Sequence, residues 1–97
     1  MNSTPRVVRI DGSHLSDWES FHTAFANACA FPDYYGRNLD AWIDCMSDLV
    51  DPTTLVIENV NLVPSEIYDA IVECSAFVNW RAPDSASLML AFCRTKG

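Results

Sequence analysis

The stretch FPDYYGRNLDAWIDCM, residues 31–46, separates two helices and so decides how the strands on either side of it are joined. Pro32 ends the preceding helix, PDYYGR forms a loop, and Asn38 can cap the helix that follows. From Leu39 to Val50 the apolar residues recur at steps of three and four, which predicts an amphipathic helix. The flanking strands must therefore be connected by a long helical crossover, which favours parallel pairing.

Three short apolar runs predict those strands: RVVRI (6–10), TTLVIEN (53–59) and SLMLAFC (87–93). The order strand, helix, helix, strand, helix, strand places a helical connection between successive strands, so right-handed parallel crossovers are expected. We therefore predict an α/β fold with a three-stranded parallel sheet packed with three to four helices. The 97 residues contain no internal repeat and no linker, which indicates a single domain over residues 1–97.

The first and third helices have recognisable beginnings. Ser16 followed by Glu19 matches a capping box, so Ser16 should cap the first helix. Ser65 can cap the third helix, which has one apolar face. The residues of that face are Ile67, Ile71, Cys74, Phe77 and Val78.

Composition argues against several classes of function. Thirteen acidic and six basic residues give a net charge of −7, which opposes direct binding to nucleic acid or an anionic membrane. The charge favours a basic partner, or it only keeps the protein soluble. No segment has the length of a signal peptide or a membrane span, which indicates a cytoplasmic protein. The four cysteines lack metal-ligand spacing, so we interpret them as buried free thiols and expect no metal or cofactor.

An enzyme is an alternative that the residues support poorly. Asp40 and Asp44 could form an acid–base pair, but their helix has no nearby nucleophile, metal-ligand set or phosphate-binding glycine loop. We interpret the isolated His14 and His22 as surface or capping residues. Asp11 follows the first strand, as a phosphoacceptor aspartate would, but the chain is short for such a signalling domain and lacks an internal lysine.

The second helix concentrates negative charge opposite its apolar side. At about 100° per residue, Asp40, Asp44 and Asp48 lie within about 80° of one another. Carboxylates at four-residue spacing repel each other, and acids near the C-terminal end of a helix oppose its dipole. Because stability alone does not favour such a row, we interpret it as a surface for a positively charged cleft.

The loop before this helix carries two adjacent tyrosines, Tyr34 and Tyr35. Adjacent loop residues point in different directions, so burying both rings is difficult. An exposed tyrosine beside carboxylates is typical of an interface hot spot. We expect Gly36 to supply a backbone angle that other residues avoid.

The segment from Pro32 to Cys45 resembles the signature of the barstar family, intracellular protein inhibitors of barnase-type bacterial ribonucleases. The family pattern is a proline, an acidic residue, Tyr-Tyr-Gly, any residue, Asn-Leu-Asp-Ala and a short stretch ending in Asp-Cys. Every one of these positions is met here. The resemblance implies a small basic barnase-like ribonuclease as the protein partner, and we expect the chain to be a monomer when free.

The resemblance also implies roles for the matching residues. Asp44 would enter the active site of the ribonuclease in place of an RNA phosphate, and Asp40 would pair with a base-recognition arginine near the rim. Tyr34 would lie against the catalytic histidine. The other expected partner-binding residues, which shape the loop or add contacts, are Gly36, Asn38, Ile43, Asp48 and Glu73.

Some positions depart from the family pattern. The family has Leu-Trp where this chain has Trp42-Ile43, which places Trp42 in the core and leaves the edge contact to Ile43. Arg37 replaces an acidic residue, and Leu49 replaces a tryptophan. These departures support a second hypothesis, a binding or immunity module with the same fold whose basic partner is not a ribonuclease.

Overall fold

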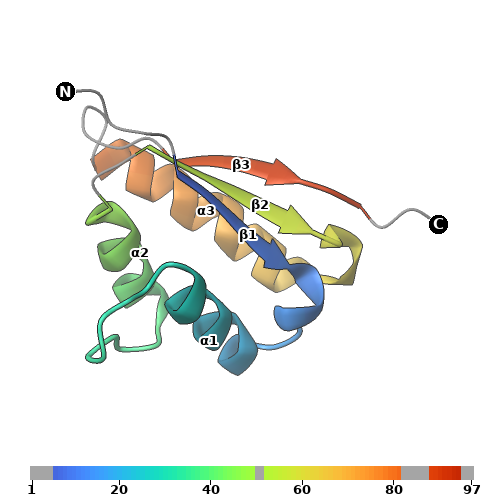
Figure 1. The fold of residues 1–97 in the computed structure, drawn as a ribbon, viewed down its shortest axis with the longest axis horizontal. Helices are drawn as coiled ribbons and strands as arrows, with labels where there is room; N and C mark the ends of the chain where they lie inside the picture. Colours follow the sequence, from blue (N-terminus) through green and yellow to red (C-terminus); the bar gives the residue numbers. More distant parts are fainter. Residues whose placement is uncertain (1–5, 50–51, 82–87, 95–97) are drawn as a thin grey trace.

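The sheet has three parallel strands in the order β1-β2-β3 (Figure 1). The computed structural model describes residues 6–49, 52–81 and 88–94. Its strands are β1 (Arg6–Asp11), β2 (Thr53–Glu58) and β3 (Leu88–Phe92). The predicted α/β fold and its parallel pairing are confirmed.

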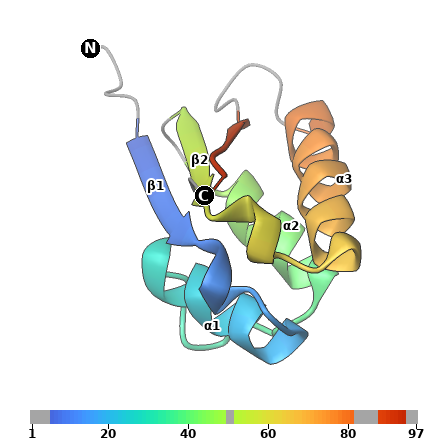
Figure 2. The same cartoon turned by 90° about the vertical axis from the view of Figure 1, so that its right-hand side faces the viewer.

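Three α-helices cover one face of this sheet: α1 (Trp18–Ala28), α2 (Leu39–Ser47) and α3 (Ser65–Arg81) (Figures 1 and 2). Two short 3₁₀ turns, η1 (Gly12–His14) and η2 (Val60–Leu62), follow β1 and β2. Successive strand residues alternate between faces, so Val8 and Ile10 are buried while Val7 and Met89 are exposed. Among the described residues, no helix has both the length and the apolar character needed to cross a membrane.

The beginnings of two helices differ from the sequence prediction. Asp17, rather than Ser16, caps α1, because its Oδ1 accepts a hydrogen bond of 2.7 Å from the Ser20 amide. Aspartate caps a helix as well as serine does, so the capping-box pattern was not decisive. Ser65 is the first residue of α3 and not its cap: the Tyr68 amide donates to the Pro64 carbonyl at 2.9 Å.

Aromatic packing fixes α2 against α1. The side chains of Trp42, Phe21 and Phe25 are fully buried, and the rings of Phe25 and Trp42 meet nearly edge to face with centroids 5.4 Å apart. The prediction that Trp42 belongs to the core is confirmed. Burying an aromatic ring of this size stabilises the fold strongly, so α2 is firmly attached through its apolar side.

The buried face of α3 is narrower than predicted. It comprises Ile67, Ile71, Ser75 and Val78, whereas Phe77 is 51% exposed. Phe77 instead packs on Trp80, with ring centroids 5.7 Å apart. The prediction for Phe77 was wrong because the buried face follows steps of four, four and three residues, which leave Phe77 on its edge.

The expectation of buried thiols holds for one cysteine. Cys29 is buried, and burial raises its pKa to about 11. Cys45 and Cys74 are half-buried, and Cys93 is exposed just beyond the end of β3. All four thiols are free.

Candidate functional site

The N-terminus of α2 is attached to the preceding loop by Asn38. Its Oδ1 accepts a hydrogen bond of 2.8 Å from the Ala41 amide, and its Nδ2 donates to the Gly36 carbonyl at 3.4 Å. Asn38 is therefore the predicted cap, and it joins the loop to the helix.

The outer side of α2 carries an acidic row, which we define as Asp40, Asp44 and Asp48. All three side chains are exposed, while Trp42 and Met46 are buried on the opposite side. Asp48 lies just after the helix, and its amide donates to the Asp44 carbonyl at 3.1 Å. The helix ends at Ser47, earlier than expected, and Val50 lies outside the described residues. The predicted separation of a buried side from an acidic side is confirmed.

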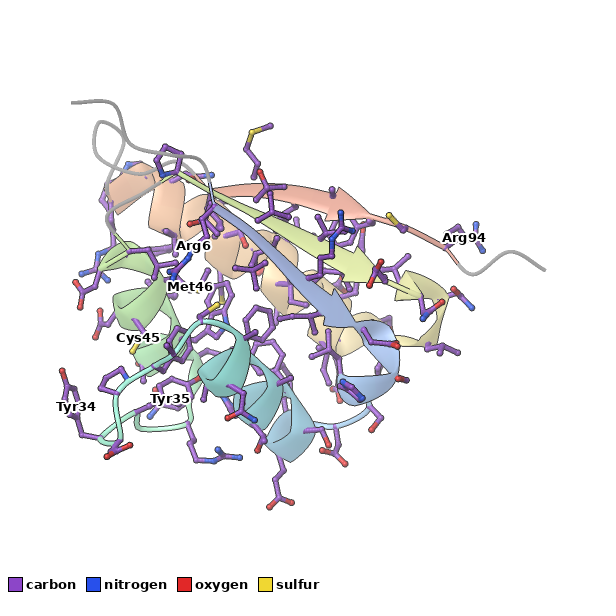
Figure 3. The ribbon with its side chains drawn as sticks, viewed as in Figure 1. Arg6, Tyr34, Tyr35, Cys45, Met46 and Arg94 are labelled. Carbon is purple, nitrogen blue, oxygen red and sulfur yellow. The ribbon has the colours of Figure 1, made fainter. Side chains whose placement is uncertain are left out.

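An open groove with a volume of about 470 Å³ lies between the loop and α2. The loop contributes Tyr34, Tyr35 and Gly36 to its lining, and α2 and its C-terminal end contribute Asp44, Cys45 and Asp48. In Figure 3, Tyr34 projects from the tip of the loop, whereas Tyr35 points back toward the helices. A positively charged side chain entering this groove would meet two carboxylates and an exposed phenol.

The two tyrosines have opposite environments. Tyr34 is 88% exposed, while Tyr35 is half-buried, with its ring centroid 4.8 Å from that of Phe31. The Tyr35 hydroxyl lies 2.6 Å from His22 Nδ1, a hydrogen-bond distance. Burial raises the pKa of Tyr35 to about 12, so this phenol stays protonated at neutral pH.

His22 is not the surface or capping residue that the sequence suggested. It is buried within α1, 6% exposed, beside the ring of Phe21. Burial, and then the positive charge of Arg37, lower the pKa of His22. His22 is therefore held neutral beneath the loop at physiological pH.

The left-handed backbone angle in the loop belongs to Arg37, with φ of 55°, and not to Gly36. The expectation that Gly36 supplies a backbone angle avoided by other residues was wrong. An added Cβ at Gly36 would lie 3.3 Å from Asn38 Nδ2 and 3.5 Å from the Ala41 Cβ, so a larger residue would press on the amide that joins the loop to the helix. The Arg37 side chain turns away from the acidic row, and its Nη2 donates to the Glu19 carbonyl at 3.0 Å and to Thr23 Oγ1 at 2.9 Å.

On the other side of α2, the last residue of α3 reaches the acidic row. Arg81 Nη1 donates to Asp44 Oδ1 at 2.8 Å, and both side chains are substantially exposed. Burial raises the pKa of Cys74 on α3, and the negative charges of Glu73 and then Asp40 raise it further, as expected if Asp40 faces α3. Ile43 is half-buried and packs against the core.

Apart from Asn38 at the helix cap and Ile43 against the core, the predicted site residues form two groups. Tyr34, Gly36, Asp44 and Asp48 line the groove. Asp40 is exposed on α2 and Glu73 is exposed on α3, and the charges of both act on Cys74. Sequence reasoning missed the contacts of Arg37 and Arg81, which join residues far apart in the chain and leave no local signal.

The groove has little of what covalent catalysis needs. Two cysteines line it, Cys29 and Cys45. Burial raises the pKa of both thiols, and the charges of Asp48 and Asp44 raise that of Cys45 further, which disfavours the reactive thiolate. Among the described residues, no three histidine, cysteine or acidic side chains are grouped as a metal site would require. What the groove offers is acceptors for hydrogen bonds from cations.

The known proteins to which this chain is similar are described as ribonuclease inhibitors. A family model described as Barstar (barnase inhibitor) matches residues 5–92. A protein of Bacillus subtilis (strain 168), named "Putative ribonuclease inhibitor YrdF", is 47% identical over 55 residues. The aligned region spans 56% of this chain and 60% of that relative, which is less than two thirds of its length.

Proposed function

The chain belongs to the barstar family, and on that premise we propose that it inhibits a barnase-like ribonuclease by inserting the acidic row and Tyr34 into the active site. The observation that carries this proposal is the exposure of Tyr34 and of two carboxylates of the row around one groove. Tyr34 is 88% exposed beside a groove whose opposite wall carries Asp44 and Asp48.

The proposed mechanism is imitation of RNA phosphates. A ribonuclease cleft must present arginine, lysine or histidine side chains to hold the phosphates of its substrate. Carboxylates on a rigid helix offer the same negative oxygens, and hydrogen bonds between arginine and carboxylate are short and directional. Asp44, in the middle of the row, would occupy a phosphate position, while Asp40 and Asp48 would contact cations on either side.

Tyr34 supplies what the carboxylates lack, a flat apolar surface with one polar atom. A rigid tyrosine ring loses little conformational entropy on binding and excludes water from neighbouring ion pairs. Its position beside the groove would bring it against an aromatic or imidazole side chain of the ribonuclease. In this proposal the chain, as one domain and one monomer, blocks its target by binding and performs no catalysis.

Charge also favours fast association. The net charge of −7 and the acidic row attract a basic enzyme before contact, which raises the association rate at low salt. An inhibitor of a ribonuclease that degrades the RNA of its own cell has to bind quickly. The charge distribution of this chain fits that requirement.

The test uses purified barnase and a fluorogenic RNA substrate. Removing one partner of a buried interfacial charge pair, in barnase–barstar complexes among others, weakens binding by about 2–5 kcal/mol. We expect wild-type chain to inhibit stoichiometrically and Asp44→Asn to inhibit more weakly by an amount in that range. Glu58→Gln is a matched control, since it removes a half-buried carboxylate on β2 that also pairs with an arginine, Arg9, and it should inhibit like wild type.

Two outcomes contradict the proposal in different ways. Equal inhibition by wild type and Asp44→Asn rejects the acidic row as the inhibitory surface. Absence of inhibition by wild type, together with Asp44-dependent capture of another basic protein, supports instead the hypothesis of an immunity module with a different partner.

A further inference from the structure

The loop that carries Tyr34 is attached to α1 at two points. The Tyr35 hydroxyl lies 2.6 Å from His22 Nδ1, and Arg37 Nη2 bonds to Thr23 Oγ1 at 2.9 Å and to the Glu19 carbonyl at 3.0 Å. His22 and Thr23 come three and four residues after Glu19, so both are neighbours of Glu19 on one side of α1. The loop therefore contacts α1 on a single side of that helix.

At the second of these attachment points, the backbone of Arg37 has an unfavourable left-handed conformation. A φ of 55° is disfavoured for any residue with a Cβ, because the side chain approaches the following carbonyl. Such a conformation persists only where surrounding contacts require it. The contacts of the Arg37 side chain that accompany this conformation are the two hydrogen bonds from its guanidinium to α1.

Tyr34 depends on these neighbours for its position. With 88% of its surface exposed, its own ring can make few contacts with the chain. The loop residues near it whose side chains bond to α1 are Tyr35, directly after it, and Arg37, three positions along the chain. Both are directed toward α1, on the side away from the acidic row.

We propose that Arg37 is a positioning residue for partner binding: by its bonds to α1 it fixes the loop so that Tyr34 stands beside Asp44 and Asp48 at the groove. This inference rests on the proposed function of the acidic row. The proposal also explains why a positively charged residue, Arg37, lies next to an acidic row that should bind cations. The Arg37 guanidinium is hydrogen-bonded to α1 and does not pair with the carboxylates of the row.

Charge and positioning predict opposite effects for the loss of Arg37. If Arg37 acts only through its charge, its removal makes the surface more acidic and strengthens binding to a basic ribonuclease. If it acts as a positioning residue, its removal frees the loop, and the complex dissociates faster because Tyr34 must be ordered on binding.

The experiment compares Arg37→Gln with Arg81→Gln, which removes the same charge from the other side of the acidic row, using barnase in stopped-flow and dissociation measurements. Both variants should associate faster at low salt. Only Arg37→Gln should also dissociate faster, by about tenfold, so that its affinity falls while that of Arg81→Gln does not. Affinity of Arg37→Gln equal to or above that of wild type overturns the proposal.

Thr23→Val tests the same contact from α1 without changing any charge. It should raise the dissociation rate and leave the association rate unchanged. The double variant Arg37→Gln/Thr23→Val should dissociate little faster than Arg37→Gln alone, since Arg37→Gln already removes the hydrogen bond to Thr23 that Thr23→Val removes. Full additivity of the two effects contradicts a shared contact.

A measurement on the free protein separates this inference from the proposed function. In ¹⁵N relaxation experiments, the order parameters of residues 33–36 should fall in Arg37→Gln and stay unchanged in Arg81→Gln. Unchanged values in Arg37→Gln overturn the positioning role whether or not barnase binds. If instead the order parameters fall but Asp44→Asn inhibits barnase normally, the proposed function fails and the loop attachment stands.

Discussion

The acidic row has two flanks that use an arginine in opposite ways. On the loop flank, residues 32–37, Arg37 turns away from the carboxylates and bonds to α1. On the α3 flank, the C-terminal turn of α3, Arg81 turns toward the row and bonds to Asp44 at 2.8 Å. The number of arginines near the row therefore says little about its charge toward a partner, because of these two arginines only Arg81 pairs with a carboxylate of the row.

The two flanks should also differ in rigidity. The loop flank combines a contact to a buried histidine with hydrogen bonds to a helix. The α3 flank relies on an ion pair whose side chains remain 42% and 66% exposed. Exposed ion pairs contribute about 0–1 kcal/mol, so little opposes the exchange of Arg81 for a cation of the partner.

The largest expected effect is on the free energy of unfolding, and it concerns the packing of α2 against α1, on which both flanks depend. Trp42→Ala should lower the free energy of unfolding by about 3–5 kcal/mol, since it empties the space between α2 and α1. Urea unfolding followed by circular dichroism measures this change. Trp80→Ala is the control, because that side chain is 75% exposed and its loss should change stability by less than about 0.5 kcal/mol. Comparable losses for both variants would show that α2 is not held through Trp42.

The second effect separates binding from folding on the loop flank. Tyr34→Ala should weaken binding to barnase by about 2 kcal/mol, as expected for an aromatic hot spot. The free energy of unfolding should not change, because the ring is 88% exposed. Isothermal titration calorimetry and urea unfolding of the same variant test both parts. Unchanged affinity would remove Tyr34 from the binding surface.

The third effect is a pH dependence that belongs to the loop flank. Burial and Arg37 lower the pKa of His22 in the folded protein, so the unfolded chain binds more protons in the window between the folded pKa and the ordinary value of about 6.5. Stability should therefore be full above about pH 6.5 and decrease as the pH falls below it. The free energies of unfolding of wild type and His22→Gln, plotted against pH, should converge at low pH. The control His14→Gln, at an exposed position, should follow the wild-type curve. Parallel curves for wild type and His22→Gln would contradict a depressed pKa.

The smallest effect belongs to the α3 flank. A double-mutant cycle with Arg81→Gln and Asp44→Asn, read by urea unfolding, should give a coupling free energy below about 1 kcal/mol. A coupling above about 2 kcal/mol would mean that the α3 flank is as firmly fixed as the loop flank. The contrast between the flanks would then fail.

The parts of this site that follow from local periodicity could be predicted from the sequence. Steps of three and four placed Trp42 inside and Asp44 outside, and the position of Asn38 before the helix identified its cap. Parallel pairing followed from helical connections between strands. These features depend on residues within a turn or two of one another.

The remaining features depend on contacts between distant residues. The pair Tyr35 and His22 is separated by 13 positions, and the pair Arg81 and Asp44 by 37. Nothing in the sequence near either member indicates the other. The sequence favours Gly36 as the left-handed residue of the loop because glycine adopts that conformation most easily, yet the residue that adopts it is Arg37, whose side chain bonds to α1.

The most direct measurement of where the partner binds is hydrogen–deuterium exchange of this chain, alone and with barnase. If the acidic row and Tyr34 form the inhibitory surface, the strongest protection on binding should fall in peptides covering residues 33–48, with little change in β1 and β3. Protection confined to the open face of the sheet around Val7 and Met89, with residues 33–48 unchanged, would contradict the proposed inhibitory surface.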